Sequence, residues 1–396
     1  MTIPAIILTI VLAPLWLLTG VFVIEVVLGL APQDKRRRAF YRRPASFTVL
    51  IPAHNEAEGI GAMLNALALA EPHGRRLVVA DNCTDDTADI ARAAGAEVIE
   101  RHDPTRRGKG WALAFGRDHL LGSERPPEVV VVLDADCTVE PGALQRVADT
   151  AFTRRCVAQA AYMFRPRRRA SPMVQISSFA MLVKNLIRQR GGFRLGAPAA
   201  LTGSGMAFPW AIFAAAPLAS GHIVEDLCLG LDLLRAGKRI RFEGRAQVWS
   251  EPSGQAGTEV QRSRWEAGFM GVAATQGLPL LAFGLTRLRW PVIWQALHVM
   301  TPPLALLLVL DALGLGAAAG LRAFDGSDLP LTISLVLTGL AILAVLAAWV
   351  TSGRAYLSSG TLLRIPFYIL WKLLLYVRIM TGRLAPSWTR TERVDP

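Results

Sequence analysis

The sequence predicts an α/β domain with a largely parallel sheet, joined to helices that span a membrane or lie in its interface. Two observations predict this fold class. From Ser46 to about Phe242, short β-branched runs alternate with longer helical patterns, as they do in α/β domains. With 396 residues, 52% apolar content and a mean hydropathy of +0.35, the chain is also too apolar for an ordinary soluble protein.

The first 31 residues are expected to form a transmembrane anchor. Residues 3–30 are almost wholly apolar apart from Glu25, which is long enough for the roughly 20 residues that cross a hydrocarbon core. The segment lacks the basic start and small-residue cleavage site of a secretory signal, which is the rival interpretation. Basic clusters follow at Lys35-Arg36-Arg37-Arg38 and Arg42-Arg43. Because such clusters stay in the cytosol, the N-terminus is expected outside and the next domain inside.

The α/β domain is expected over residues 44–270. Its β-branched runs predict strands at 47–51, 77–80, 97–99 and 129–133. Between them, residues 56–70 and 85–94 are expected to be helices, the second with Thr84 as its N-cap. This order favours a mostly parallel sheet whose ligands bind at the carboxyl ends of the strands.

The C-terminal part returns to membrane-like composition. Residues 291–320 and 329–351 are apolar enough to span, and they predict a transmembrane hairpin over 291–352. Within the C-terminal region 361–396, residues 361–383 predict an interfacial helix, because aromatic residues share it with a basic face formed by Arg364, Lys372, Arg378 and Arg383. Three spans place the basic tail in the cytosol.

A second amphipathic stretch covers residues 171–190 and carries Lys184, Arg188 and Arg190 near its end. Core packing and membrane contact both explain this stretch, so the sequence leaves the choice open.

The net charge of +12 favours a membrane partner over nucleic acid. Its arginines crowd the ends of apolar segments, where anionic headgroups lie. The four cysteines are dispersed with no C-x-x-C pair, which indicates neither a disulfide framework nor a zinc site. A multi-pass protein of the plasma (inner) membrane, with its α/β domain facing the cytosol, is expected.

An acidic triplet, Asp134-Ala135-Asp136, follows the apolar run 129–133. Because side chains at i and i+2 of a strand point the same way, the end of this strand can offer two carboxylates to one divalent cation. Such a cation can hold a diphosphate. Asp-x-Asp alone is weak evidence, since it is common in solvated turns.

Polar residues also follow the first two strands. The first strand runs into Pro52-Ala53-His54-Asn55-Glu56, and the second ends at Asp81. A carboxylate at Asp81 can accept the imide N–H of a uracil. Asp85 and Asp86 are expected only to complement a helix dipole.

Three further segments add to the pattern. The basic loop Arg106-Arg107-Gly108-Lys109-Gly110 suits a diphosphate, although no Ser or Thr follows the lysine as a P-loop requires. Ile223-Val224-Glu225-Asp226-Leu227 precedes Gln261-Arg262-Ser263-Arg264-Trp265, with 35 positions from Asp226 to Gln261.

Taken in order over residues 51–265, these motifs resemble those of membrane-integrated family 2 glycosyltransferases. The family pattern runs from P-x-x-N-E through an Asp-rich segment, D-x-D and a T-E-D-like triplet to Q-x-x-R-W. The chain is similar to bacterial exopolysaccharide glycosyltransferases and, more distantly, to cellulose, chitin and hyaluronan synthases. The resemblance implies a GT-A fold, which is a Rossmann-like, mostly parallel sheet, with hexosyltransferase activity and Mg²⁺ or Mn²⁺ as cofactor.

The resemblance also implies roles for individual residues. Asp136 would bind the metal ion and Asp226 would be the catalytic base. The donor nucleotide would be held by Pro52, Glu56, Asp81, Lys109, Asp134 and Arg264. The acceptor would meet Gly203, Ser204, Gly205, Glu225, Gln261 and Trp265. Val224 replaces the Thr of the family's T-E-D triplet, which leaves the base intact but offers no hydroxyl beside it.

One carboxylate that deprotonates an acceptor hydroxyl suffices for an inverting displacement, because a metal ion and cationic side chains neutralise the leaving diphosphate. The expected activity is transfer of one sugar from a nucleotide sugar, in first place a UDP-sugar, to a lipid-linked acceptor in exopolysaccharide or glycolipid synthesis. A processive synthase, favoured by Q-x-x-R-W, and a non-catalytic scaffold with a decayed transferase fold are the alternatives. The sugar, the acceptor lipid and the oligomeric state stay open.

Overall fold

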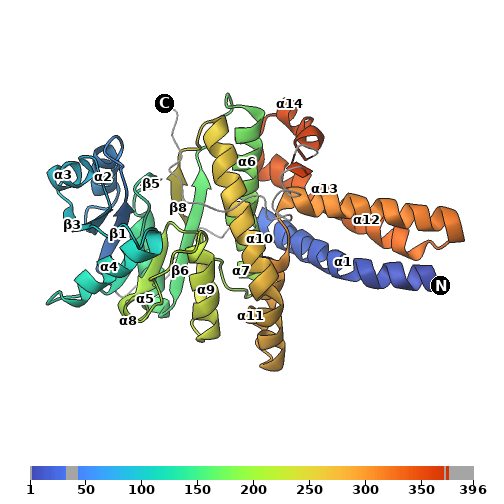
Figure 1. The fold of residues 1–396 in the computed structure, drawn as a ribbon, viewed down its shortest axis with the longest axis horizontal. Coiled ribbons are helices and arrows are strands. Elements are labelled where there is room, and N and C mark those ends of the chain that lie inside the picture. Colours follow the sequence, from blue (N-terminus) through green and yellow to red (C-terminus); the bar gives the residue numbers. More distant parts are fainter. Residues whose placement is uncertain (1, 33–42, 370–371, 374–396) are drawn as a thin grey trace. The chain divides into compact units, whose positions relative to one another are not determined.

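The computed structural model describes residues 2–32, 43–369 and 372–373 (Figure 1). These residues divide into two compact units. The sheet unit is drawn from residues 32–165 and 198–252. The helical unit is drawn from residues 1–31, 166–197 and 253–396.

The sheet unit is built on an eight-stranded sheet, counted over its described residues, with the order β3-β2-β1-β4-β7-β6-β8-β5. One half is parallel and matches the four predicted strands: β1 (Phe47–Ala53), β2 (Arg75–Asp81), β3 (Glu97–Arg101) and β4 (Val129–Val132). All four valines of β4 are fully buried, as expected for a strand that lies inside a sheet covered on both faces.

The other half of the sheet is mixed, and the sequence analysis did not identify its strands. β7 (Met206–Pro209) pairs antiparallel with both β4 and β6 (Val157–Phe164). β8 (Ile240–Ser250) runs parallel to β6, and β5 (Cys137–Val139) is antiparallel to β8. The fold is therefore a mixed α/β sheet. This arrangement brings the end of β8 beside the segment that follows β4.

Helices of the sheet unit begin later than the sequence predicted. The segment expected to be helical from residue 56 becomes α2 only at Ile60, and the one expected from residue 85 becomes α3 only at Thr87. Thr84 is therefore not the N-cap of α3; its N–H donates to Asn55 Oδ1 (2.8 Å) instead. The helices are α2 (Ile60–Ala70), α3 (Thr87–Ala93), α4 (Lys109–Leu121), α5 (Ala143–Arg154), α8 (Trp210–Ala214) and α9 (Glu225–Arg235).

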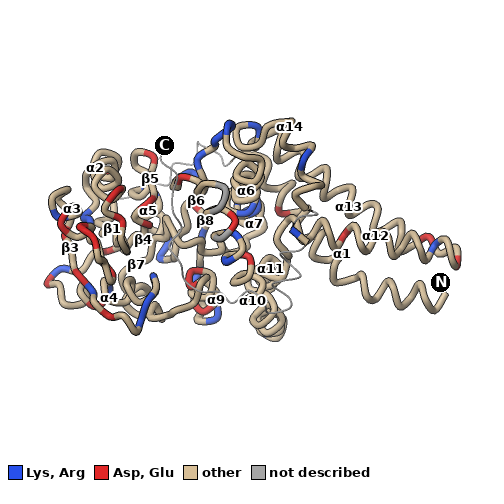
Figure 2. The backbone as a smooth tube through the Cα atoms, turned by 45° about the horizontal axis from the view of Figure 1, so that its top comes forward, with Lys and Arg blue, Asp and Glu red and all other residues tan. Residues whose placement is uncertain are grey.

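The helical unit contains four helices, among the residues described, that are long and apolar enough to cross a membrane. They are Ile3–Leu30, Gly257–Thr286, Leu304–Asp325 and Leu329–Gly353. Figure 2 shows how few charged residues lie along α1 (Ile3–Leu30), α12 (Leu304–Asp325) and α13 (Leu329–Ala348). The remaining elements are α6 (Pro172–Leu182), a π-helix (Val183–Arg188), α7 (Gln189–Arg194), α10 (Gln255–Thr286), α11 (Trp290–Met300), a second π-helix (Trp349–Gly353) and α14 (Ser359–Leu362).

Two expectations about the spans are corrected. The span expected over 291–320 is broken, because α11 ends at Met300 and α12 begins at Leu304. Pro302 and Pro303 lie between them, and proline has no N–H to continue the helical hydrogen bonds. In addition, α10 has the length and apolarity of a span although the sequence analysis counted only three. The cytosolic position expected for the C-terminal tail depended on a count of three spans, and this count is no longer supported.

The stretch 171–190 packs against α1 at its basic end. Arg188, 6% exposed, donates through Nε to the fully buried carboxylate of Glu25 (2.7 Å). Glu25 also accepts from Trp294 Nε1 (2.9 Å) and contacts His298 Nδ1 (2.8 Å). A charge in an apolar helix is thus compensated by protein contacts, as buried charges must be. For Arg188, core packing is the explanation that holds.

Two further arginines donate hydrogen bonds to backbone carbonyls at the C-terminal end of α1. Arg190 donates to the carbonyl of Gly29 (3.2 Å), and Arg194 donates to the carbonyls of Leu28 and Ala31. The last carbonyls of a helix have no partner within the helix, and cationic groups bind them favourably.

The expected interfacial helix at 361–383 is only partly described. Arg364 and Phe367 are exposed, the latter by 76%, as expected for a membrane interface. Lys372, one of the four residues of the expected basic face, is instead 2% exposed and paired with Glu266. Arg378 and Arg383 lie outside the described residues.

Candidate active site

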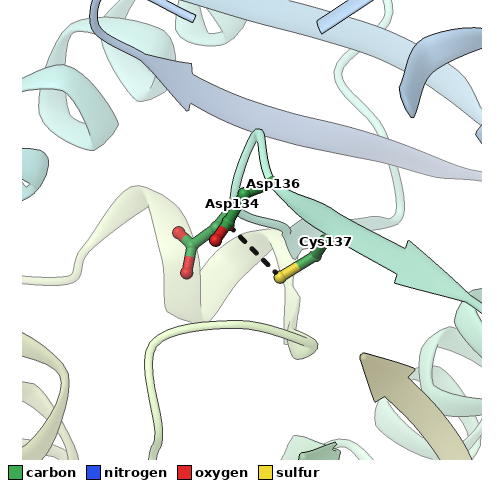
Figure 3. Close-up of side chains that lie close together, drawn as sticks. All are labelled: Asp134, Asp136 and Cys137. Atoms are coloured by element: carbon green, nitrogen blue, oxygen red, sulfur yellow. Dashed lines mark hydrogen bonds between the residues drawn. The ribbon is translucent and has the colours of Figure 1, made fainter. Parts of the chain in front are cut away.

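The acidic triplet forms a turn rather than a strand end. β4 stops at Val132, and the N–H of Cys137 donates to the carbonyl of Asp134 (3.1 Å), which closes the turn. Possible ligand atoms of Asp134, Asp136 and Cys137 all lie within 4.8 Å of one another (Figure 3). The two carboxylates were predicted to converge, but the turn and not strand geometry brings them together.

The donor set of this turn fits a hard divalent cation. Mg²⁺ and Mn²⁺ prefer oxygen ligands, which Asp134 and Asp136 supply. Burial raises the pKa of the Cys137 thiol well above its usual range, and the charge of Asp136 raises it further. The thiol therefore keeps its proton and donates to Asp136 Oδ1 (3.6 Å). Asp134 and Asp136 are the residues that could hold the ion.

Asp136 is held from the far half of the sheet. The hydroxyl of Ser250, the last residue of β8, donates to Asp136 Oδ2 (2.9 Å). A hydrogen bond joins Ser250 in turn to the buried hydroxyl of Tyr162 on β6. The sequence analysis missed Ser250 because it did not identify β8.

Lys109 connects the triplet to the glycine loop at 203–205. Its Nζ donates to Asp134 Oδ1 and to the carbonyl of Gly203 (2.6 Å). Burial acts to lower the pKa of Lys109, but the charges of Asp134, Glu225 and Asp226 outweigh it and raise the pKa. For Asp134, burial raises the pKa and Lys109 opposes this shift. The lysine thus stays charged among carboxylates.

Gly203-Ser204-Gly205 is a loop with a glycine in the left-handed region at each end. Gly203 has φ of +86° and Gly205 has φ of +70°. A Cβ at Gly203 would lie 3.4 Å from Asp226 Oδ2 and 3.5 Å from Lys109 Nζ. The loop therefore places a backbone carbonyl, a lysine and the expected catalytic base in one small space.

Ser204 anchors this loop to the acidic turn. Its hydroxyl accepts the backbone N–H of Asp134 (3.1 Å) and donates to Cys137 Sγ (3.3 Å). Its carbonyl accepts from Gln159 Nε2 on β6 (2.9 Å). Ser204 is fully buried, so these hydrogen bonds hold the loop against the acidic turn from within the sheet unit.

Glu225 and Asp226 open α9 and are both half-buried. Burial raises the pKa of Glu225 to about 8, and repulsion from Asp226 adds to the shift. Asp226 Oδ1 accepts the N–H of Leu227 (2.8 Å), which fixes the side chain at the first turn of the helix. Carboxylates at a helix N-terminus are favoured by the helix dipole.

The ends of β1 and β2 form a second polar cluster. Asn55 and Asn82 both have positive φ, at +54° and +52°, so each strand turns sharply after its last residue. The N–H of Glu56 donates to Thr87 Oγ1 (2.8 Å), which links the two turns. Pro52 lies in β1, one residue before its end.

Asp81 has a partner that the sequence did not reveal. Arg101, at the end of β3, donates to Asp81 Oδ1 (2.6 Å), and Asn82 Nδ2 donates to the same oxygen (3.0 Å). Burial raises the pKa of Asp81, while Arg101 opposes the shift.

Gln261, Arg264 and Trp265 lie on α10 in the helical unit, whereas the acidic turn lies in the sheet unit. Their spacing of three and four residues puts them on one face of that helix.

Comparison with known proteins identifies the family of this chain. A family model described as glycosyltransferase like family 2 matches residues 44–268. An uncharacterised glycosyltransferase of Mycobacterium tuberculosis is 39% identical over 101 residues, which cover 25% of this chain and 41% of that protein. A 4,4'-diaponeurosporenoate glycosyltransferase of Staphylococcus aureus is 32% identical over 96 residues, 24% of each chain. The chain thus matches less than half the length of these relatives.

Among solved structures, the chain resembles a mannosyltransferase of Pyrobaculum calidifontis in complex with GDP-mannose and Mn²⁺. The TM-score is 0.50 at 17% identity, covering 87% of this chain and 97% of that one. A glucosyl-3-phosphoglycerate synthase of Mycobacterium tuberculosis with Mn²⁺, UDP and phosphoglyceric acid gives a TM-score of 0.41 at 22% identity, covering 57% and 78%. The mannosyltransferase likeness extends over most of both chains and shows a shared fold.

Proposed function

Because the chain belongs to the glycosyltransferase like family 2, we propose that it transfers a sugar from a nucleotide sugar to a lipid-linked acceptor, with inversion at the anomeric carbon. Membership of this family supports an active glycosyltransferase over the non-catalytic scaffold. The proposal concerns its donor, acceptor, stereochemistry and place in the cell.

One observation carries the proposal: Lys109, Asp134 and Asp226 surround the Gly203 backbone within the sheet unit. A transfer needs a cation for the leaving diphosphate and a base for the attacking hydroxyl, close together but not neutralising each other. Lys109 is hydrogen-bonded to Asp134, and a Cβ on Gly203 would meet both Lys109 Nζ and Asp226 Oδ2 within 3.5 Å. Both groups are therefore present in one small space.

Asp134 and Asp136 are assigned to the metal ion, with Ser250 holding one oxygen of Asp136. Mg²⁺ or Mn²⁺ supplies charge neutralisation on the diphosphate when bound. Lys109 contributes a permanent positive charge beside the same carboxylate, as a phosphate-binding point charge. The solved mannosyltransferase with Mn²⁺ supports the choice of ion.

Asp226 is assigned as the base that removes the proton of the acceptor hydroxyl. A single base on the side opposite the leaving group gives one displacement and hence an inverted product. Glu225, with its pKa raised to about 8, carries a proton near neutral pH.

The donor base is assigned to the cluster at the ends of β1 and β2, with Pro52, Glu56 and Asp81. A carboxylate has about four acceptor sites, so Arg101 and Asn82 leave Asp81 able to accept a ring N–H. Uracil and guanine both offer such an N–H. We place UDP-sugars first, and the likeness to a GDP-mannose enzyme makes GDP-mannose the main competitor.

The acceptor is proposed to be a lipid-linked sugar or lipid at the membrane, in exopolysaccharide or glycolipid synthesis. Four helices that could span a membrane support a membrane acceptor. The basic clusters at residues 35–43 favour a cytosolic sheet unit in the plasma membrane. Gln261 and Trp265 are assigned to the acceptor, and Arg264 to the diphosphate, by the family resemblance.

A processive synthase is the second candidate, because Q-x-x-R-W is prominent in polymer synthases and α10, which carries it, is itself apolar enough to span. Product length separates the two candidates.

The test incubates the purified full chain in lipid nanodiscs with Mn²⁺, polyprenyl phosphate lipids, and UDP-glucose, UDP-galactose, UDP-N-acetylglucosamine or GDP-mannose. We expect nucleoside diphosphate release from one donor, with a lipid product carrying one sugar in inverted configuration by proton NMR. Retained configuration would refute the single displacement, and long polymer would favour the synthase. Release without any lipid product would contradict the lipid acceptor.

A further inference from the structure

A buried ion pair joins α10 to the described residues 359–369 and 372–373, here called the C-terminal segment. Lys372 is 2% exposed and Glu266 is 6% exposed, and the ammonium group of Lys372 donates to Glu266 Oε1. Arg262, one turn before Glu266 on α10, lies 3.5 Å from the same oxygen. All three residues belong to the helical unit.

A second contact runs parallel to the first. Tyr368 is hydrogen-bonded to Arg262, and the Lys372 ammonium lies 5.5 Å from the Tyr368 ring centroid. Arg262 and Glu266 are four residues apart on α10 and therefore share one face of that helix. Tyr368 and Lys372 thus contact the same face of α10 at two successive turns.

Such a cluster fixes geometry more than it adds stability. Burying an ion pair costs desolvation energy that its attraction barely offsets, and the best-attested use of buried polar groups is to set register. A shift of Lys372 along α10 would separate it from Glu266 and leave the buried Lys372 ammonium without its carboxylate, while Glu266 would keep only the 3.5 Å pair with Arg262. The position and rotation of α10 against this segment are therefore specified.

The same helix carries Gln261, Arg264 and Trp265. At about 100° per residue, the face of Arg262 and Glu266 lies about 120° around the axis from the face of these three residues. Because α10 is one rigid helix, a contact that fixes the face of Arg262 and Glu266 also fixes the direction of the face that carries the Q-x-x-R-W residues. Glu266 directly follows Trp265, so the fixed point lies within one residue of the motif.

We propose that Lys372 and Glu266 are positioning residues, a clamp through which the C-terminal segment sets the orientation of the Q-x-x-R-W face of α10 for sugar transfer. This proposal rests on the proposed function for its effect on transfer. The orientation of α10 can be measured without it.

The first test uses the full chain in nanodiscs and measures orientation directly. Gln261→Cys is labelled with N-ethylmaleimide, and mass spectrometry reports the rate at that position. Adding Lys372→Ala is expected to raise the labelling rate several-fold. Lys372→Arg, which keeps the charge, and Arg322→Ala, which breaks the exposed pair with Asp328 in the same unit, are expected to leave it unchanged. Equal rates with and without Lys372→Ala would overturn the clamp.

The second test measures transfer with UDP-glucose and GDP-mannose. Lys372→Ala is expected to lower kcat about 10- to 100-fold, the range for a misplaced site, with unchanged affinity for Mn²⁺ and nucleotide. Lys372→Arg, which keeps the charge beside Glu266, is expected to keep kcat near that of the wild type. A loss in Lys372→Arg as large as in Lys372→Ala, in a folded protein, would count against the clamp.

The two proposals fail in different ways. If Arg264→Ala and Trp265→Ala leave transfer unchanged, the role assigned to the motif is wrong, while the labelling rates still report on the clamp. If those variants lose transfer but Lys372→Ala does not, the role of Arg264 and Trp265 in transfer is supported and the clamp is overturned.

Discussion

Lys109 and Asp134 form an ion pair that closes the candidate site: the lysine ammonium donates to the Asp134 carboxylate and also to the carbonyl of Gly203. Through one side chain, α4 is tied to the turn after β4 and to the glycine loop before β7. The acidic residues Asp136, Glu225 and Asp226 lie around the same charge. Removing the Lys109 ammonium is therefore expected to change both the stability of the sheet unit and the stabilisation that a bound metal ion gives it.

Lys109→Ala is expected to lower the free energy of unfolding of the metal-free protein by about 1–3 kcal/mol, because it leaves partly buried carboxylates without a partner. Mn²⁺ should then raise Tm more in the variant than in the wild type, since the ion binds a site with more uncompensated charge. Thermal unfolding with and without Mn²⁺ measures both effects. Lys109→Arg keeps the charge and serves as control. An unchanged Tm in Lys109→Ala would count against this ion pair.

Asp226→Asn tests the catalytic base. The variant keeps the size of the side chain but cannot take a proton, so kcat is expected to fall about 100- to 10,000-fold. Nucleotide affinity in the presence of Mn²⁺ should stay the same. Asp232→Asn is the matched control, because Asp232 lies on the same helix but is about half exposed and pairs with Arg235. Comparable losses in both variants would show that the change acts through α9 and not through the base.

Gly205→Ala tests the loop that supports the acidic turn. A Cβ at Gly205 would lie 2.8 Å from Ala160 Cβ and 2.9 Å from Val248 Cγ2, at a positive φ. We expect a loss of about 2–5 kcal/mol from strain and overpacking, measured by denaturant unfolding. Gly237→Ala also has positive φ but meets nothing within 4 Å, so it should cost only about 1 kcal/mol. Equal losses would mean that the contacts around Gly205 relax.

Glu225 predicts a pH dependence of stability. Its folded-state pKa of about 8 lies above the ordinary value of 4.5, so the folded protein holds a proton that the unfolded chain has released. The stabilisation is fully present below about pH 4.5 and is lost as pH rises toward 8. Glu225→Gln should flatten this fall in Tm, whereas the exposed Glu124→Gln should not. A parallel decline in all three proteins would refute the assignment to Glu225.

Glu25→Ala tests the buried cluster on α1. The substitution leaves Arg188 buried without its carboxylate, and removing one partner of a buried pair costs about 3–5 kcal/mol. Loss of thermal stability in detergent is the measurement. Replacing both residues by leucine should restore much of the loss, because no charge then stays buried. If the double variant is as unstable as Glu25→Ala, packing and not charge explains the effect.

Sequence patterns identified the parallel half of the sheet because its strands are continuous β-branched runs. The sequence analysis did not identify β8, because this strand carries Arg241, Glu243 and Arg245. The structure buries Glu243 through hydrogen bonds with Thr150 and Arg245. Ser250 and its hold on Asp136 were missed with it. Pro302 and Pro303 could have predicted the break before α12, but a mean hydropathy taken over the whole apolar stretch does not register two prolines.

The sequence by itself determined that this chain joins an α/β domain, with acidic residues after its strands, to apolar helices. It could do so because β-branched runs, D-x-D and long apolar segments are local patterns. Only the tertiary structure decided that a turn and a glycine loop bring Asp134, Lys109 and Asp226 together, and that Lys372 faces Glu266 and not water. Such pairings depend on burial and on backbone turns between distant segments. No local pattern encodes them, since a charged side chain reads the same in sequence whether it ends in solvent or beside a buried partner.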